Sequence, residues 1–286
     1  MKQIVFISGK GGTGKSTLVA SLNLLVNQKM LADCDVDAPN LHLLVHGEQI
    51  RQSDFSGAKV ARIDLEKCVS CGLCRQVCRF DAITEDFKVR PMACEGCAAC
   101  LVMCPTEAIE LLAVKTGETY VSRTAQGTFA HARLAIGAEG SGKLVTEVRK
   151  SLHEYQQDED WVLIDGSPGI GCVVIASITG TDAVVAVAEP TPSGRHDLER
   201  VLAVAEHFKV PAFVCINKYD LNMSETQAIQ AECQRRGVKV IGQIPFEPAI
   251  VKALQQGLTP VEAGLADIVG EIEKMWLRLT EAIAIE

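Results

Sequence analysis

Short apolar segments that do not alternate with polar residues lie towards both ends of the chain. They occupy residues 4–7, 161–164, 183–188 and 212–216, with less regular apolar segments at 30–32 and 238–241. Continuous apolar segments of this length are typical of parallel strands that are buried on both faces. Candidate helices lie among them, at 17–26, 194–208 and 224–236. This alternation predicts an α/β domain with a mostly parallel sheet and helices on both faces.

Residues 60–112 interrupt this pattern with a cysteine-rich internal repeat. A shift of 26 residues superimposes Cys68, Cys71, Cys74 and Cys78 on Cys94, Cys97, Cys100 and Cys104. The same shift places Ala82 and Ile83 on Ala108 and Ile109, so two packing residues repeat together with the cysteines. The α/β pattern resumes after this block. We therefore predict an inserted domain at 59–112, within a larger domain that is formed by 1–58 and 113–286.

The length and composition are those of an ordinary globular protein. The chain has 286 residues, enough for one large domain and a small module, and 48% of them are hydrophobic and 22% charged. The formal net charge of −8 argues against general binding to nucleic acids, which requires a basic face. The sequence has no apolar run of about 18 residues, so we expect no insertion into a membrane. Residues 4–7 are followed at once by a glycine-rich segment, which predicts a first strand rather than an export signal, and hence a cytoplasmic protein.

Residues 9–16 match the phosphate-binding motif G-x-x-x-x-G-K-[ST] between a predicted strand and a predicted helix. In this motif, backbone N–H groups and the helix N-terminus hold phosphate oxygens. Lys15 is expected to reach the β- and γ-phosphates, and the Ser16 hydroxyl to bind Mg²⁺. The alternative is a glycine-rich turn with a chance lysine, but the strand–loop–helix context favours a nucleotide site. The predicted nucleotide-binding residues in this segment are Gly11, Gly12, Thr13, Gly14, Lys15, Ser16 and Thr17.

Lys10 adds a second lysine to this loop. With it, residues 9–17 resemble the deviant Walker A motif of the MinD/ParA/Mrp ATPases, a group that includes nitrogenase reductase. The resemblance implies a P-loop NTPase fold of the SIMIBI type, ATP hydrolysis, and a homodimer that encloses the nucleotides at its interface. It also implies that Lys10 acts on the partner subunit's ATP, where a further cation would stabilise the transferring phosphoryl group.

Two further segments resemble the switch regions of this group. Residues 33–40 are similar to switch I, which implies that Asp35 orients the attacking water and that Asp33 lies near Mg²⁺. Residues 164–169 are similar to the Walker B strand and switch II, which implies that Asp165 holds Mg²⁺ through water. An isolated aspartate at a strand end is more commonly a helix or turn cap. The occurrence of these segments in the order of the family favours the functional interpretation.

Two segments near the end of the chain resemble the base-binding part of the family. Residues 216–220 are similar to its base-recognition corner, which implies that Asn217 contacts the adenine edge. Residues 242–246 are similar to a loop of the group, which implies that Pro245 contacts the nucleotide. The resemblance covers 1–58 and 113–265, nearly all of the chain outside the cysteine-rich block.

Both cysteine runs follow the spacing of bacterial ferredoxins, C-x₂-C-x₂-C-x₃-C, in which the fourth cysteine of each run ligates the other cluster. We therefore predict two [4Fe–4S] clusters, one held by Cys68, Cys71, Cys74 and Cys104 and the other by Cys94, Cys97, Cys100 and Cys78. Zinc ribbons also use C-x₂-C pairs, but not two runs of four with crossed partners. Arg79 stands where ferredoxins usually have a proline, which leaves a backbone N–H and a charge near the second cluster.

Four cysteines lie outside these runs: Cys34, Cys172, Cys215 and Cys233. Cys215 is within an apolar segment and is predicted to lie in the core. Cys172 follows Asp165 at the offset of a ligand that nitrogenase reductase uses for a cluster shared between subunits. That enzyme supplies its second ligand from a region matching 130–142, which has no cysteine here. We therefore predict a packing or switch II role for Cys172.

Taken together, these segments resemble MinD-type ATPases with an inserted ferredoxin domain. We expect a homodimer that couples ATP turnover to electron transfer through the two clusters, to an unidentified redox or metallocofactor protein. The alternative is an ATP-switched scaffold or positioning factor, whose clusters are structural, sensory or related to iron–sulfur assembly.

Two more segments bear on this choice. A positioning role would favour a membrane-binding C-terminal helix, but acidic residues outnumber basic ones in 265–286, so we expect that helix to pack on the sheet. Residues 137–143 are glycine-rich but lack the context of a second phosphate loop. We expect a surface loop there, with Lys143 available to a partner.

Overall fold

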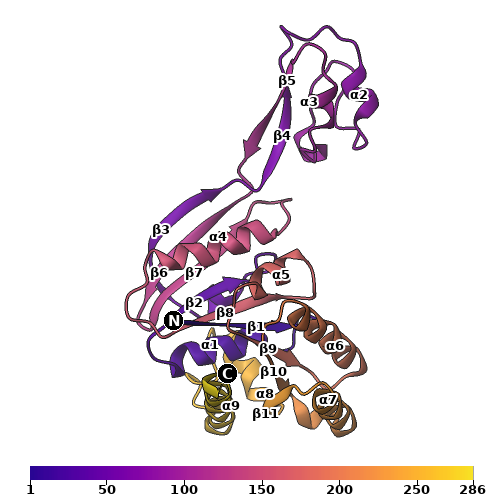
Figure 1. Cartoon of the computed structure of the whole chain (residues 1–286). Coiled ribbons are helices and arrows are strands. Elements are labelled where there is room, and N and C mark those ends of the chain that lie inside the picture. Colours follow the sequence, from indigo (N-terminus) through magenta and orange to yellow (C-terminus); the bar gives the residue numbers. More distant parts are fainter. Residues whose placement is uncertain (286) are drawn as a thin grey trace. The chain divides into compact units, whose positions relative to one another are not determined.

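The computed structural model describes residues 1–285, which form two compact units (Figure 1). The first unit contains Met1–Gln52, Thr119–Arg133 and the chain from Gly140 onward, and the second contains Ser53–Glu118 and Leu134–Glu139. The positions 59 and 112, at which the sequence was divided, fall inside two paired strands, β4 (Ala58–Ile63) and β5 (Ile109–Val114). The compact unit is therefore longer than the predicted 59–112, because it includes the whole of both strands on either side of the cysteine-rich repeat.

The first unit is organised around a sheet that has nine strands within the described residues. Their order is β11-β10-β9-β1-β8-β2-β7-β6-β3, and the neighbours from β11 to β7 pair in parallel. This confirms the prediction of a mostly parallel α/β sheet. The strands are β1 Lys2–Ser8, β2 Lys29–Cys34, β3 Gly47–Phe55, β6 Gly117–Thr124, β7 Gly127–Leu134, β8 Trp161–Pro168, β9 Ala183–Ala188, β10 Ala212–Asn217 and β11 Lys239–Ile244.

Six of these strands coincide with the apolar segments of the sequence, whereas β3, β6 and β7 were not predicted. The strand β3 is almost entirely exposed at the edge of the sheet, so it needs no apolar pattern. The strands β6 and β7 mix polar and apolar residues and are joined by only two residues, Ala125 and Gln126, which makes them a hairpin. The sequence signal for buried parallel strands therefore misses this end of the sheet.

Helices cover both faces of the sheet (Figure 1). On one face, α1 (Lys15–Leu25) packs against β1 and β8 and also against α9 (Ala266–Ile285). Ile4 and Phe6 of β1 belong to the core cluster on this face, together with residues of α1 and α9. The opposite face carries α4 Gly142–His153, α5 Cys172–Ile178, α6 Pro192–His207 and α7 Met223–Arg235, while α8 Pro248–Gln255 precedes α9.

The C-terminal helix packs on the sheet, as the sequence predicted. Ile272, Met275 and Leu279 of α9 are buried against the core, and Trp276 meets Trp161 of β8 edge-to-face at 5.2 Å between ring centroids. The last predicted position of this helix, Glu286, lies outside the described residues. None of the helices within residues 1–285 is both long and apolar enough to cross a membrane.

The second unit holds the cysteine repeat. Its strands β4 and β5 pair in antiparallel register from Ala58–Val114 to Ile63–Ile109. Each cysteine run contains one short helix just before its fourth cysteine, α2 (Leu73–Val77) in the first repeat and α3 (Ala99–Met103) in the second. The small core of this unit is formed by Ala61, Cys74, Ile83 and Ile109, with cysteines and aliphatic side chains around it. The two positions that repeat with the cysteines, Ala82–Ile83 and Ala108–Ile109, are all buried.

The glycine-rich residues 137–143 lead into a helix rather than forming a phosphate loop. Ser141 caps α4 by accepting a hydrogen bond from the N–H of Leu144, and Lys143 already lies in the first turn of that helix. The backbone N–H of Gly140 donates to Asp37 Oδ1 at 2.9 Å. The predicted surface loop is therefore confirmed for 137–141, whereas residues 142 and 143 belong to α4, and the partner contact of Lys143 stays a prediction.

Candidate nucleotide site and cysteine sites

The glycine-rich loop connects β1 to the N-terminus of α1. Gly12 and Gly14 have φ angles of 82° and 88°, in the left-handed region that residues other than glycine rarely adopt. A Cβ atom on Gly14 would overlap Asn217 Nδ2, whereas Gly12 has open space beside it. The loop therefore needs glycine at position 14 for two reasons: its backbone angle and the close approach of the strand end of β10.

A buried ion pair lies beneath this loop. Lys15, the first residue of α1, donates to Asp165 Oδ1 of β8 at 2.6 Å, and both side chains are almost completely buried. Asp35 Oδ2 lies 3.9 Å from the same ammonium group. Asp33, at the end of β2, accepts the N–H groups of Asp35 and Leu41 at 3.0 and 3.1 Å. Parallel strands thus bring all three predicted acidic residues to one edge of the sheet, next to Lys15.

Burial and charge act together on these groups. Burial alone would lower the pKa of Lys15, but Asp165 and then the other two carboxylates more than offset this effect and raise it. Burial, followed by repulsion from Asp165, raises the pKa of Asp33 to about 8. Burial also raises the pKa of Asp35, against the opposing effect of Lys15. The site therefore carries more buried carboxylate than its one lysine neutralises, an arrangement that favours an added cation.

Two buried polar atoms of this site have no hydrogen-bond partner among the described residues: Thr13 Oγ1 and Asp165 Oδ2. Unsatisfied groups of this kind are costly in a folded protein unless a ligand or ion completes them. The Ser16 hydroxyl lies 3.4 Å from Lys15 Nζ, close to the same carboxylates. A hydroxyl and carboxylate oxygens are the donor set that Mg²⁺ prefers, so these residues fit a magnesium ion.

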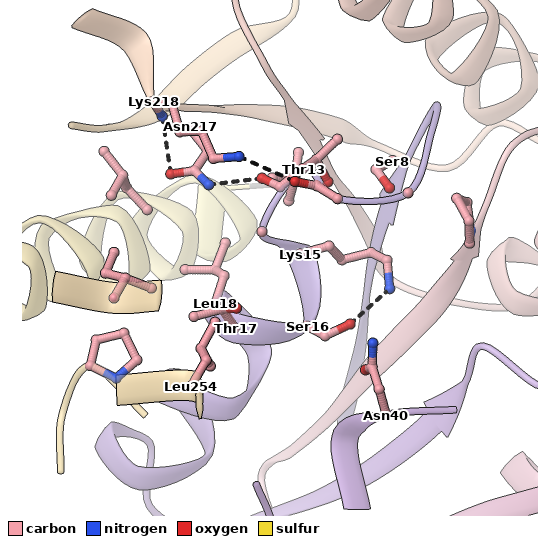
Figure 2. A pocket seen from close by; sticks show the side chains of 18 of the residues that line it. Ser8, Thr13, Lys15, Ser16, Thr17, Leu18, Asn40, Asn217, Lys218 and Leu254 are labelled. Carbon is pink, nitrogen blue, oxygen red and sulfur yellow. Dashed lines mark hydrogen bonds between the residues drawn. The ribbon is translucent and has the colours of Figure 1, made fainter. Parts of the chain in front are cut away.

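The cavity around the loop has a volume of about 630 Å³ and continues beyond the loop into an apolar region. Figure 2 shows Lys15 and Ser16 near Asn40, and Thr13 beside Asn217 and Lys218. Asn217 Nδ2 donates to the carbonyl of Thr13 at 2.7 Å, and Lys218 Nζ donates to the carbonyl of Gly12 at 3.2 Å. The lining includes all the residues predicted to bind nucleotide, from Gly11 to Thr17 with Asn217 and Pro245, and it includes Asp35. A polar end and an apolar end in one cavity suit a phosphate-bearing ligand with a flat ring.

The predicted signature lysine does not point into this cavity. Lys10 Nζ lies 3.4 Å from Glu189 Oε2 and 3.4 Å from Thr191 Oγ1, at the end of β9. The other oxygen of Glu189 accepts a hydrogen bond from Lys218. One carboxylate thus holds both Lys10 of the glycine-rich loop and Lys218 of the turn after β10. No motif in the sequence identified the part played by Glu189 or Lys218.

The eight cysteines of the repeat line two hollows in the second unit. One hollow is lined by Cys68, Cys71, Cys74 and Cys104, and the other by Cys78, Cys94, Cys97 and Cys100. The sets are crossed, since each contains three cysteines of one run and the fourth cysteine of the other. They are the same two sets that the ferredoxin spacing predicted.

Backbone N–H groups point at three of these sulfur atoms. Ala82 N donates to Cys78 Sγ at 3.4 Å, Ala108 N to Cys104 Sγ at 3.3 Å, and Ala61 N to Cys94 Sγ at 3.5 Å. Such hydrogen bonds stabilise thiolates and adjust cluster potentials. Within residues 1–285, no group of three or more Cys, His, Asp or Glu is arranged to hold a single metal ion. A cubane cluster presents four separate iron atoms to its four cysteines, so its ligands stand farther apart than those of one ion. The donor set and its placement therefore fit a cluster.

The remaining cysteines differ in exposure. Cys215 is completely buried in β10, which confirms its predicted place in the core, and Cys34 and Cys233 are buried as well. Burial raises the pKa of all three thiols, which makes them unreactive. Cys172 is exposed at the start of α5, so it has no packing role in the core, and the switch II role predicted as the alternative stays a prediction. The residues before it turn outward after Gly169 (φ 99°), and this leaves the first residue of a short helix at the surface.

Comparison with known proteins places these features in a family context. The model of the CobQ/CobB/MinD/ParA nucleotide-binding domain matches residues 4–261. The uncharacterized protein MJ0578 of Methanocaldococcus jannaschii is 34% identical over 77% of this chain and 79% of its own, and the septum site-determining protein MinD of Bacillus subtilis is 22% identical over 89% and 80%. The structure of MinD from Pyrococcus horikoshii complexed with Mg-ADP matches with a TM-score of 0.57, at 19% identity and with 96% of this chain and 93% of that chain covered. These matches establish an α/β fold like that of MinD.

We predict that Gly14→Ala destabilises the protein more than the same change at a glycine with equal backbone strain. Gly180→Ala is the matched control, since Gly180 has a φ of 75° and nothing within 4 Å of an added Cβ. Left-handed strain alone costs about 1–2 kcal/mol. In urea unfolding, the free energy of unfolding should fall at least twice as far in Gly14→Ala as in Gly180→Ala. The double variant Gly14→Ala/Asn217→Ala should recover part of that loss, because Asn217 no longer meets the added Cβ. Equal losses at the two glycines would contradict the close approach of Asn217.

Proposed function

Because this chain belongs to the CobQ/CobB/MinD/ParA nucleotide-binding family, whose MinD and ParA members are ATPases, we propose that it is an ATP-hydrolysing iron–sulfur protein. In this proposal, ATP turnover drives electron transfer through two [4Fe–4S] clusters to a redox or metallocofactor protein. The observation that carries it is the gathering of eight cysteines into two crossed sets of four, in a chain that also has a buried Lys15–Asp165 nucleotide site. The cytoplasm is the proposed location because its reducing conditions keep thiols available as ligands.

The nucleotide site divides the work among its residues. The N–H groups of residues 11–17 bind the phosphates, and Lys15 neutralises charge at the β- and γ-phosphates. Ser16, Asp33 and Asp165 hold Mg²⁺, which supplies a positive charge to the developing phosphate oxygens. Asp35, at the mouth of the cavity and 3.9 Å from Lys15, orients the attacking water. Asn217 and Pro245 lie at the apolar end of the cavity and contact the base.

Lys10 acts on the nucleotide of a second copy of the chain. Its ammonium group is held by Glu189 and Thr191 on its own subunit and stays about one-third exposed. In a homodimer that meets through the nucleotide face, Lys10 leaves Glu189 and adds a cation to the partner's phosphates, where it stabilises the transition state.

We predict that Lys10→Ala lowers the rate of ATP hydrolysis by at least about a hundredfold, while the Kd for ATP changes less than about threefold. The reason is that Lys10 does not line the cavity of its own subunit but serves the transition state in the partner. Phosphate release and calorimetric titration with Mg-ATP measure the two quantities. Lys150→Ala, which removes an exposed lysine from α4, is the control. Full turnover by Lys10→Ala would refute this role.

The two sets of cysteine thiolates would hold the clusters, which would supply one-electron redox chemistry. Amide hydrogen bonds to Cys78, Cys94 and Cys104 stabilise the negative charge of these ligands. Arg79 follows Cys78 directly, so the set that contains Cys78 has a cation beside it that the other set lacks at the matching position, Pro105. We therefore expect the two sets to give bound clusters different potentials.

We predict about eight iron atoms per chain after anaerobic purification. The crossed assignment is tested by double variants, since Cys78 and Cys97 line one hollow while Cys71 and Cys97 line different ones. Cys78→Ser/Cys97→Ser should keep about four iron atoms, whereas Cys71→Ser/Cys97→Ser should lose nearly all. Cys172→Ser is the control and should keep eight. Zinc in place of iron would refute the cluster assignment. Loss of nearly all the iron in both double variants, the result expected if each run of four held its own cluster, would refute the crossing.

The chain itself offers a route from the nucleotide to the clusters. Asp35 and Asp37 belong to one turn, and Asp37 Oδ1 accepts the N–H of Gly140. Residues 134–139 immediately before Gly140 belong to the second unit, where Ala135 N donates to the carbonyl of Thr116 at 2.9 Å and Gly137 lies beside Met92. Met92 precedes Cys94 by two residues. A movement of residues 35–37 on ATP binding or hydrolysis would therefore pull on the chain that leads to the second unit.

We predict that Mg-ATP shifts the midpoint potential of at least one cluster by on the order of 60 mV, which corresponds to a tenfold coupling for one electron. In Gly140→Ala the shift should disappear, because an added Cβ would overlap the Asp37 carboxylate and break the hydrogen bond. Gly270→Ala, with open space around it, is the control. Anaerobic redox titration followed by electron paramagnetic resonance measures the shift.

The same titration separates the proposal from its alternative. Similarity to the septum site-determining protein MinD over 89% of the chain favours an ATP-switched scaffold as the second candidate. An unchanged midpoint potential in the wild-type protein would support that candidate, in which the clusters serve sensing or docking.

A further inference from the structure

The corner that follows β10 contains an aspartate that the proposed function does not use. Residues 217–220 read Asn-Lys-Tyr-Asp, and the first two bind the glycine-rich loop through the carbonyls of Thr13 and Gly12. Lys218 has a φ of 57°, in the left-handed region, and its backbone N–H donates to the side chain of Asn217 at 3.1 Å. The turn is therefore held in a single, strained conformation by its own side chains.

This turn is fixed from its other end as well. Thr226 of α7 donates its hydroxyl to the carbonyl of Tyr219 at 2.6 Å, and Asn222 caps the same helix by accepting from Glu225 N. With both ends fixed, Asp220 projects towards the loop after β11. Its Oδ1 accepts the backbone N–H of Phe246 at 2.7 Å. Asp220 thus joins two loops that are 26 residues apart in sequence.

Asp220 does not line the cavity, but the loop that it holds does. Among the described residues, the lining at the base end includes Asn217, Pro245 and Phe246 but not Asp220. The loop at 245–247 is held by Asp220 on one side and by the cap that Glu247 makes to Ala249 N on the other. The carboxylate therefore acts on the wall of the cavity from outside it.

The chemistry of the bases gives this arrangement a consequence. Guanine presents N–H donors that a carboxylate in the cavity would accept, whereas an amide side chain can pair with the N6 and N7 atoms of adenine. Because Asp220 accepts the N–H of Phe246, the side-chain amide of Asn217 is the group available to contact the base. After its hydrogen bonds to the Thr13 carbonyl and the Lys218 N–H, this amide still has one N–H and one oxygen lone pair for the base. The turn therefore places the Asn217 amide, which can pair with adenine, at the base, and keeps the Asp220 carboxylate, which could pair with guanine, away from it.

We propose that Asp220 is a positioning residue that sets the preference for adenine over guanine by holding the Phe246 loop against the base instead of contacting the base itself. This inference rests on the proposed nucleotide site and adds to it the residue that shapes the base end. Because Asp220 acts on binding of the base, its loss should change the Kd and KM for ATP and leave the rate of the chemical step unchanged.

The experiment measures binding of Mg-ATP, Mg-GTP and Mg-XTP by calorimetry, and ATP hydrolysis, for the wild-type protein and two variants. Asp220→Ala removes the acceptor for Phe246 N, and we expect it to raise Kd and KM for ATP roughly three- to tenfold with kcat unchanged. Asp220→Asn keeps an acceptor oxygen and should restore ATP binding to within about twofold. Asp158→Ala removes one exposed carboxylate that is distant in sequence from Asp220. It is the control for charge and should bind the three nucleotides like the wild-type protein.

The variants separate a positioning role from direct reading of the base. Xanthine offers a carbonyl where guanine has its amino group, so a carboxylate that reads guanine would, as an amide, prefer xanthine. Preference for XTP by Asp220→Asn, or wild-type binding of GTP as tight as that of ATP, would overturn the inference and leave the nucleotide site intact. Failure of the wild-type protein to bind any of the three nucleotides would instead refute the proposed function itself.

Discussion

The buried pair of Lys15 and Asp165 is the interaction on which the arrangement of the nucleotide site depends. It joins the first residue of α1 to the end of β8, at 2.6 Å and away from solvent. Because β8 lies between β1 and β2, this contact brings the glycine-rich loop against the strand ends that carry Asp33 and Asp35. Removing Lys15 would leave buried carboxylates without their cation, and such a loss typically costs about 3–5 kcal/mol. The carboxyl ends of parallel strands are the usual place for ligands in such folds, and here one ion pair defines that place.

The same pair leaves the site electrostatically incomplete. One lysine faces three carboxylates, the pKa of Asp33 is raised to about 8, and Asp165 Oδ2 has no partner among the described residues. A protein selected only for stability would not bury such groups without partners. In the second unit, backbone N–H groups donate hydrogen bonds to cysteine sulfur atoms, an arrangement that stabilises negatively charged thiolates. Both places therefore present groups whose negative charge a positively charged ligand would neutralise.

Much of this arrangement could be predicted from the sequence, where a physical rule links spacing to position. Continuous apolar segments predicted six parallel strands, and the run of cysteines predicted which four would share a hollow. The strands β3, β6 and β7 could not be predicted, because an exposed edge and a polar hairpin lack the apolar pattern. The bridging position of Glu189 between Lys10 and Lys218, and the contact of Asp220 with Phe246 N, arise from loops that meet only after folding. The exposure of Cys172 had no sequence signal either, since its neighbours Val173 and Val174 are apolar and buried.

The crossing of the cysteine sets has a consequence for the origin of the second unit. Each repeat of 26 residues supplies three members of one set and a single member of the other, so a lone repeat completes neither. Two copies of one repeat on separate chains would complete both sets at once, with the same exchange of fourth cysteines. A symmetric pair of short peptides is therefore a sufficient ancestor, and joining them into one chain fixed a pairing that already existed. In such a symmetric pair the two halves are identical, so a difference like that between Arg79 and Pro105 requires two separately encoded copies of the repeat.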